Sequence, residues 1–167
     1  MTSGFAIENV AVDDPRAVAL RCLLDDDLDA RYAHLNAAEP ADVGERRRSA
    51  LEVHAPQVCA TLLALDADGT PLGHAMLRRL GEEWELKRLV VGPAARRRGV
   101  GRALVLDVID RARAGGARRV ILQTGSAQPE SLALYIALGF TPIPVYEPYV
   151  ATMSESLCFE LVLEQAA

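Results

Sequence analysis

Residues 96–103 read Arg96-Arg97-Arg98-Gly99-Val100-Gly101-Arg102-Ala103, and this run constrains the fold more than any other part of the chain. It stands between a strand-like segment, residues 84–91, and a helix-like segment, residues 101–114. A glycine-bearing loop that opens a helix directs several backbone N–H groups at one point, and such a point binds phosphate. The sequence therefore predicts a strand, a loop and a helix with an anion site at the start of the helix.

The segments around this unit predict a mixed sheet flanked by helices. Branched and aliphatic runs between turn residues predict strands at 5–10, 57–66, 71–80, 84–91, 118–124 and 156–163. Helices are expected at 15–28, 42–54, 101–114 and 128–138, the last ending at Gly139. The three strands from 57 to 91 are joined by short turns and are therefore antiparallel, whereas the strand–helix–strand unit from 84 to 124 implies a parallel pair with a right-handed crossover.

Composition narrows the class of protein. A chain of 167 residues is long enough for one domain with a real core, residues 1–167. Its apolar runs are too short to span a membrane and no basic leader precedes them, so we expect a soluble, cytoplasmic protein. The net charge of −5 argues against a general nucleic-acid binder. Three dispersed cysteines, Cys22, Cys59 and Cys158, are expected to be small buried residues, and no metal is implied.

Two common nucleotide-binding motifs do not fit the glycine loop. A dinucleotide fingerprint needs a third glycine at position 104, which is Leu104. A P-loop needs Gly-Lys-Ser/Thr, which this loop lacks. The alternative to a ligand-binding loop is a plain turn followed by a helix start.

Three motifs in chain order resemble those of the GNAT superfamily of acyl-CoA N-acyltransferases. Its phosphate-binding pattern, Arg/Gln-x-x-Gly-x-Gly/Ala, is matched by Arg96, Gly99 and Gly101. The Leu-x-Val-x-Pro pattern of the preceding strand is present at residues 89–93, and the Leu-Tyr-x-x-x-Gly-Phe signature of a later helix at residues 134–140. The resemblance covers about residues 57–140, and the segment around 146–160 resembles one bacterial subgroup.

This resemblance implies a single GNAT-like α/β domain, a mixed and mainly antiparallel sheet whose parallel strand pair splays at the cofactor site. It also implies acetyl-CoA as co-substrate and direct transfer of the acetyl group to an amine of a small molecule or peptide. Strand residues Leu89, Val90 and Val91 are expected to pair with pantetheine as an added strand does. The remaining expected cofactor contacts are Arg96, Arg97, Arg98, Gly99, Val100, Gly101, Arg102, Ala103 and Gln128, the last at a position where many relatives have asparagine.

Glu85 is the residue that the resemblance marks as a general base, because several members place a glutamate eleven residues before the loop arginine. An alkyl ammonium is roughly 99.9% protonated near pH 7, so something must accept its proton before attack. A carboxylate is a poor base unless burial beside Trp84 and Leu86 raises its pKa toward neutrality. The alternative is that Glu85 pairs with Lys87 or Arg88 on an exposed strand face.

Tyr135 matches the tyrosine that, in the family, protonates the departing thiolate of coenzyme A. The alternative is an aromatic residue that packs into the core at helical spacing with Leu132 and Ile136. A non-catalytic coenzyme-A-binding sensor or scaffold is the rival function, and it would need neither Glu85 nor Tyr135.

The acceptor and the oligomeric state are left open by the sequence, with a homodimer as one option. The acidic run 25–29 is expected near the end of the first helix, where it either borders the acceptor cleft and attracts a cationic amine or is a solvated helix end. Further residues that line the cleft or simply pack are Tyr32, His34, His74, Tyr146 and Tyr149.

Overall fold

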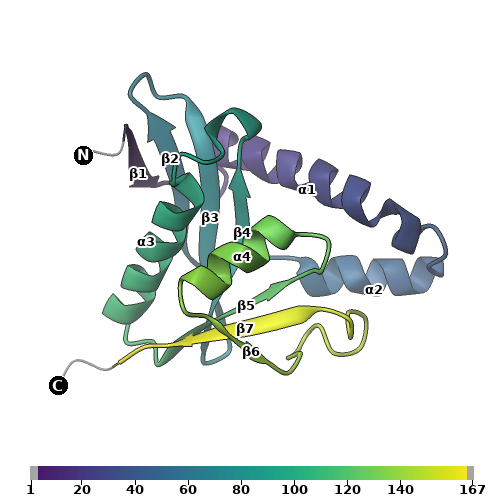
Figure 1. Cartoon of the computed structure of the whole chain (residues 1–167). Helices are drawn as coiled ribbons and strands as arrows, with labels where there is room; N and C mark the ends of the chain where they lie inside the picture. Colours follow the sequence, from purple (N-terminus) through teal and green to yellow (C-terminus); the bar gives the residue numbers. More distant parts are fainter. Residues whose placement is uncertain (1–3, 165–167) are drawn as a thin grey trace.

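Seven strands form one sheet in the order β1-β2-β3-β4-β5-β7-β6 in the computed structural model, which describes residues 4–164 (Figure 1). The strands are β1 (Phe5–Asn9), β2 (Val58–Asp66), β3 (Pro71–Leu80), β4 (Glu83–Val91), β5 (Arg119–Thr124), β6 (Thr141–Ile143) and β7 (Leu157–Val162). All neighbours are antiparallel except β4 and β5, which are parallel. The predicted mixed, mainly antiparallel sheet with one parallel pair is confirmed.

Helices cover both faces of this sheet. They are α1 (Pro15–Asn36), α2 (Ala41–Leu51), α3 (Val100–Ala114) and α4 (Pro129–Ala137), with two short 3₁₀ turns, η1 (Ala55–Gln57) and η2 (Pro93–Ala95). α3 and α4 pack on one face, and α1 packs on the other (Figure 1). Within residues 4–164 no helix has both the length and the apolar character needed to cross a membrane.

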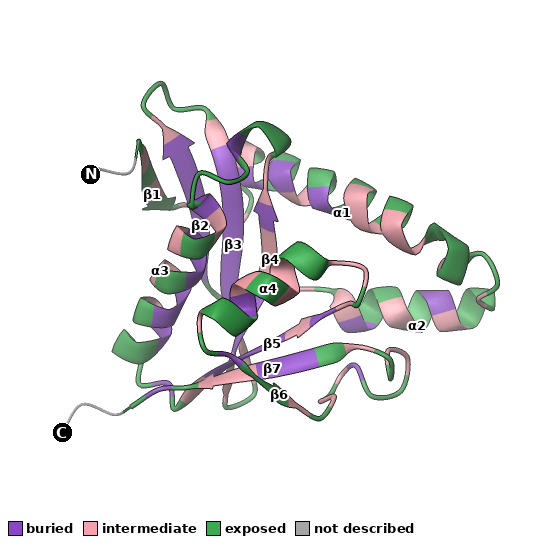
Figure 2. Ribbon diagram, viewed as in Figure 1, coloured by how far each residue is buried: buried purple, intermediate pink, exposed green. Residues whose placement is uncertain are grey.

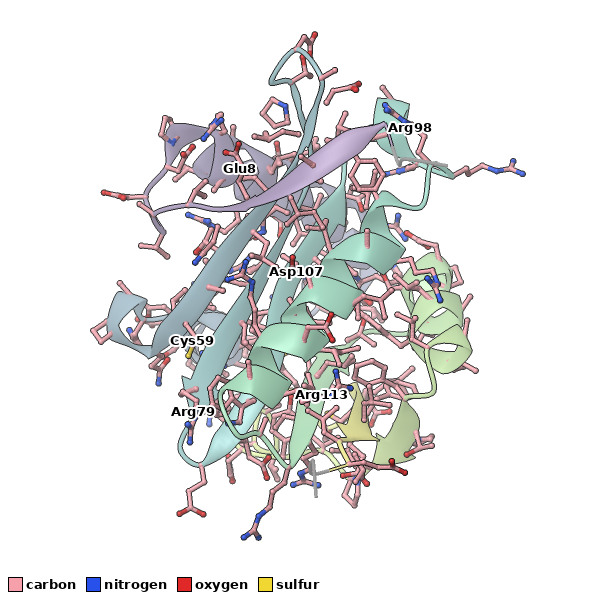
Figure 3. The ribbon with its side chains drawn as sticks, turned by 90° about the vertical axis from the view of Figure 1, so that its left-hand side faces the viewer. Glu8, Cys59, Arg79, Arg98, Asp107 and Arg113 are labelled. Carbon is pink, nitrogen blue, oxygen red and sulfur yellow. The ribbon has the colours of Figure 1, made fainter. Side chains whose placement is uncertain are left out.

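The core lies between the central strands and their helices (Figure 2). The apolar stripe of α3 is buried, and its members are Val100, Leu104, Val105, Val108, Ile109 and Ala112. Asp107 and Arg113 lie on the side of α3 that faces away from the sheet (Figure 3). On the opposite face α1 contributes Ala17, Leu20 and Leu24 to a second cluster. The apolar side of α3 therefore sets its packing on the sheet.

The first turn of α3 lies very close to β3 because β3 carries a glycine there. A Cβ atom on Gly73 would lie 2.9 Å from Val100 Cγ1 and 2.9 Å from the carbonyl oxygen of Val90. Real Cβ atoms do not approach that closely without a shift of the backbone or the helix. Gly73 thus lets the start of α3 lie directly over β3 and beside the end of β4.

α1 continues to Asn36, beyond its predicted end at residue 28. Tertiary contacts stabilise the extra turns: Arg31 donates to the carbonyl of Ala127 at 2.8 Å, and Tyr32 Oη accepts from the Ala127 N–H at 3.1 Å. A helix gains most of its stability from such packing, which a local pattern does not contain. The acidic run 25–29 consequently lies inside α1 and not near its end, contrary to the prediction.

Three smaller predictions were also wrong. α2 ends at Leu51 instead of residue 54, because the chain becomes extended at Glu52, whose carbonyl accepts from Arg78 at 3.0 Å. The short strand β6 was not predicted in its proline-rich segment; it is the edge strand, where proline is tolerated. Cys158 is buried as expected, but Cys22 and Cys59 are exposed.

Candidate active site

The parallel strands β4 and β5 separate after only three paired residues. Their register runs from Trp84↔Val120 to Leu86↔Leu122, and beyond this point β5 pairs with β7 instead. β4 carries one extra residue against β3 at the same place, and Arg88 there adopts a φ of 57°. Such a bulge bends the strand and ends its pairing. The predicted splay between the two strands is present, and its vertex lies at residue 87.

The end of β4 leaves a row of backbone groups without a strand partner. On one edge, the Gly92 N–H donates to the Leu72 carbonyl of β3 at 2.8 Å. Because N–H and C=O groups alternate in direction along a strand, Leu89 and Val91 direct theirs to the other edge. Within residues 4–164 no strand pairs with that edge beyond Leu86. This edge without a strand partner contains residues 89–91, for which the sequence predicts pairing with pantetheine.

The glycine loop ends in a helix start with free amides. Gly99 has a φ of 79° and is the N-cap residue of α3. The first backbone bond of the helix is from Ala103 N–H to the Gly99 carbonyl, at 3.0 Å. The amides of residues 100–102 therefore have no acceptor in a preceding turn. A Cβ on Gly99 would meet no atom within 4 Å, so open space lies beside this loop.

Two side chains near the loop, Arg98 and Gln128, already interact with other groups of the protein. Arg98 forms an ion pair with Asp66 at 3.3 Å, which ties the loop to the end of β2 (Figure 3). Gln128, the N-cap residue of α4, turns back on its own loop, where its Oε1 accepts from the Gly125 N–H at 3.4 Å. Compared with Arg98 and Gln128, the backbone amides at the start of α3 are therefore more open to an anion.

Glu85 is fully buried on β4, with 0% of its surface exposed. Arg78 binds Oε1 through Nε at 3.0 Å and through Nη2 at 2.9 Å. Tyr146 donates to Oε2 at 2.9 Å, and Tyr149 donates to Oε1 at 3.1 Å. Both carboxylate oxygens are therefore occupied, and the negative charge is balanced by a buried guanidinium.

These neighbours differ from the ones that the sequence predicted for Glu85. Burial is confirmed, but Trp84 and Leu86 point to the α3 face of the sheet, because successive residues of a strand face opposite sides. The alternative pair is correct in its partner but not in its exposure: Lys87 Nζ lies 3.9 Å from Glu85 Oε1, and both residues are buried. Arg88 pairs with Asp25 instead.

Lys87 completes this group of residues. Its Nζ donates to Tyr149 Oη at 2.9 Å and lies 5.0 Å from the centre of the Tyr149 ring. Burial lowers the pKa of Lys87 to about 8, although the nearby carboxylate acts in the opposite direction. Burial, followed by the charge of Glu85, raises the pKa of both tyrosines. We call Arg78, Glu85, Lys87, Tyr146 and Tyr149 the Glu85 cluster.

Part of the Glu85 cluster had a signal in the sequence. The turn at residues 81–82 places Leu80 opposite Glu83, and the same register places Arg78 opposite Glu85. Tyr146 was named only as a residue that lines a cleft or packs, because no local pattern links it to a strand some sixty positions earlier.

His74, on the neighbouring strand β3, contacts the backbone of the β4 bulge. Its Nδ1 lies 2.8 Å from the Arg88 carbonyl and its Nε2 lies 3.2 Å from Arg21 Nη1. The neutral imidazole fits both contacts by donating from Nδ1 and accepting at Nε2. Burial lowers the pKa of His74 to about 4, which keeps this form. The Arg88 side chain pairs with Asp25 of the acidic run, and His34 is exposed.

Tyr135 is a core residue of α4 with a free hydroxyl. Its ring centre lies 5.8 Å from that of Phe140, and the residue belongs to the core beneath α3. Leu132 packs on the same core, but Ile136 is 62% exposed and does not. No partner among residues 4–164 hydrogen-bonds the Tyr135 hydroxyl, and burial raises the pKa of the phenol.

Residues 19–140 match the model of the Acetyltransferase (GNAT) family, which is well over half of the chain. The chain belongs to the GNAT family. The splayed strands, the glycine loop and the tyrosine-bearing helix all lie within the matched region or at its end. The resemblance found in the sequence is therefore confirmed at the level of the family.

Named acetyltransferases are among the relatives of this chain. The N-alpha-acetyltransferase RimI of Mycobacterium tuberculosis is 35% identical over 85 residues, which cover 48% of this chain and 52% of the relative. The IAA acetyltransferase of Azospirillum brasilense is 40% identical over 65 residues, covering 39% and 42%. The chain thus spans about half the length of these curated relatives.

Solved structures share the fold over nearly the whole chain. The ribosomal-protein-S18-alanine N-acetyltransferase of Escherichia coli has a TM-score of 0.62 at 20% identity, covering 98% of this chain and 96% of the other. The PaiA N-acetyltransferase of Thermoplasma acidophilum, solved in complex with coenzyme A, has a TM-score of 0.65 at 16% identity, covering 95% and 99%.

Proposed function

We propose that this GNAT chain is an acetyl-CoA-dependent N-acetyltransferase that moves the acetyl group directly to an amine of a small molecule or peptide. One observation carries the proposal: the unpaired edge of β4 leads, through the glycine loop, into the unpaired amides of α3. The first feature suits the amide groups of pantetheine and the second suits a pyrophosphate. The names of the relatives support the same chemistry.

The residues present fit acetyl-CoA at this place. The backbone of Leu89, Val90 and Val91 pairs with pantetheine, and residues 96–103 bind the phosphates. Gly99 leaves room for a phosphate oxygen to approach the backbone, because no atom lies within 4 Å of its missing Cβ. Gln128 contributes only after its side chain leaves the loop that it now caps.

The proposed transfer proceeds within one ternary complex. The amine attacks the thioester carbonyl, whose oxygen is polarised by a β4 amide near Val91. Glu85 is the carboxylate toward which the amine proton moves, through the hydroxyl of Tyr146 or Tyr149, since both of its oxygens are occupied. Tyr135 gives a proton to the departing sulfur, and its raised pKa keeps the phenol protonated until then.

Calorimetric binding of acetyl-CoA and thermal unfolding test the cofactor site. The test variant is Gly99→Asp, and the matched control is Gly116→Asp, which has a similar φ of 87° at the opposite end of α3. Ligand at about 100 times its Kd adds roughly 2.7 kcal/mol of stability, which raises Tm by several degrees. We expect Gly99→Asp to lose this gain and Gly116→Asp to keep it. No binding to the wild type at millimolar acetyl-CoA would contradict the proposal.

Turnover on an amine panel separates an enzyme from a coenzyme-A-binding sensor. Tyr135→Phe is expected to lower kcat at least tenfold with little change in acetyl-CoA affinity, because the lost group acts on the leaving thiolate. A protein that binds acetyl-CoA but transfers it to no amine would favour the sensor. The cytoplasmic location and a homodimer stay predictions.

A further inference from the structure

Lys87 is the only lysine in a chain that has 18 basic residues, and it is buried. It is also the first residue of β4 beyond the last pair with β5, so it stands at the vertex of the splay. The proposed function places the thioester in this splay. A buried amine therefore lies beside the place where an acceptor amine must lose its proton.

A continuous chain of hydrogen bonds joins Lys87 to Glu85. Lys87 Nζ donates to Tyr149 Oη at 2.9 Å, and Tyr149 donates to Glu85 Oε1 at 3.1 Å. Arg78 Nη2 also donates to Tyr149 Oη, at 3.1 Å. The titratable and charged groups that face Lys87 are Arg78 from β3, Glu85 and Arg88 from β4, Tyr149 from the segment before β7, and Cys158 from β7. Tyr146, from the same segment as Tyr149, faces Glu85.

The charge balance of the Glu85 cluster makes Lys87 easier to deprotonate than an exposed lysine. Two buried cations, Arg78 and Lys87, face one carboxylate, and Arg78 is the one that binds it at 2.9 Å. An uncompensated buried charge is costly, and a lysine avoids the cost by releasing its proton. Arginine stays protonated in proteins, whereas a buried lysine titrates near neutrality. Burial lowers the pKa of Lys87 to about 8, in agreement with this balance.

We propose that Lys87 is the residue that takes the proton directly from the acceptor amine, with Tyr149 linking it to Glu85. This inference rests on the proposed function and refines the role given there to Glu85, whose oxygens are both occupied and whose surface is 0% exposed, against 6% for Lys87. Glu85 then acts as a positioning residue that stabilises the lysine ammonium.

The step balances in protons and electrons. The acceptor ammonium first releases one proton to water. The neutral nitrogen then forms a bond to the thioester carbonyl carbon with its lone pair, and an N–H proton of the attacking nitrogen passes to the lone pair of neutral Lys87 Nζ. The C–S bond breaks, and sulfur leaves with the bonding electrons and takes a proton from Tyr135. Lys87 then returns its proton to water, and Tyr135 regains one from water, before the next turnover.

The first test measures the protonation of Lys87 without any acceptor. Protein labelled with ¹³C-lysine gives a single set of side-chain signals, because the chain has one lysine. We expect these signals to titrate with a midpoint near pH 8, well below that of an exposed lysine. The variant Arg113→Lys supplies that reference from an exposed position on α3. Equal midpoints for the two lysines would overturn the inference and leave the proposed function standing.

The second test uses turnover on the amine panel. Lys87→Arg keeps the positive charge but cannot be deprotonated, so kcat should fall about 100-fold or more while acetyl-CoA affinity stays within twofold. In the wild type, kcat should rise with pH at the midpoint found by NMR, and Glu85→Gln should move both midpoints to lower pH. Thermal unfolding checks that Lys87→Arg is folded; if it is not, agreement of the two wild-type midpoints decides.

The outcomes separate the two proposals. Wild-type turnover that Lys87→Arg retains within twofold overturns the role of Lys87 alone. Stable acetylation of Lys87 by acetyl-CoA also overturns it, because an amide nitrogen cannot take the proton. A wild type that acetylates no amine contradicts both proposals, since without transfer there is no proton for Lys87 to accept.

Discussion

The two faces of the sheet around β4 use different chemistry. On the α3 face, apolar side chains fix the helix and leave backbone amides open, and we propose that ligand binding there depends on these main-chain groups. On the α1 face, the Glu85 cluster buries charged side chains that satisfy one another. A site made of backbone groups tolerates most changes of side chain but needs glycine where two segments of backbone lie very close. The Glu85 cluster, by contrast, needs each of its side chains to satisfy the others. The predictions below test this contrast.

Arg78→Met should have the largest effect, because it removes the main partner of the buried Glu85 carboxylate. Breaking a buried ion pair from one side costs about 3–5 kcal/mol of unfolding free energy. The matched control is Arg79→Met on the same strand, whose guanidinium lies 4.5 Å from the Trp84 ring and should cost about 0.5–1 kcal/mol. Urea unfolding measures the free energy of unfolding of both variants. Equal losses would show that the buried ion pair of Arg78 with Glu85 is worth no more than the contact of Arg79 with Trp84.

Acid should lower the free energy of unfolding through His74, which lies on the α1 face. Burial lowers the pKa of His74 from its ordinary 6.5 to about 4, so the folded state favours the neutral ring. This contribution, about 3 kcal/mol, is present above pH 6.5 and is lost as pH falls toward 4. Unfolding free energies at pH 7 and 4.5 should differ more in the wild type than in His74→Asn, which keeps a donor for Arg88. An equal change in unfolding free energy between pH 7 and 4.5 in the two proteins would contradict this prediction.

Gly73→Ala should give a smaller loss, on the α3 face. Its new Cβ meets Val100 and the Val90 carbonyl at 2.9 Å, and such overpacking costs about 1–3 kcal/mol. Because the clash moves the start of α3, acetyl-CoA affinity should fall along with stability. A variant with lower Tm and unchanged acetyl-CoA affinity would show that the anion site does not depend on this contact.

Local patterns predicted the α3 face better than the α1 face, for a physical reason. The strands from 58 to 91 and the stripe of α3 follow from alternation and helical spacing, because their partners are close in sequence. The extension of α1 depends on Ala127, and the surroundings of Glu85 depend on Tyr146 and Tyr149. Contacts over such separations leave no local pattern. Among the partners of Glu85, Lys87 is close in sequence and Arg78 could have been found from the register of its hairpin.

The most direct test of the account is hydrogen exchange of the backbone amides with and without acetyl-CoA. The account predicts slower exchange for peptides that contain the end of β4 and the start of α3, residues 89–91 and 99–102, and little change in α2. Protection confined to the α1–α2 side, or none at all at saturating acetyl-CoA, would contradict the claim that the β4 edge and the α3 amides form the cofactor site.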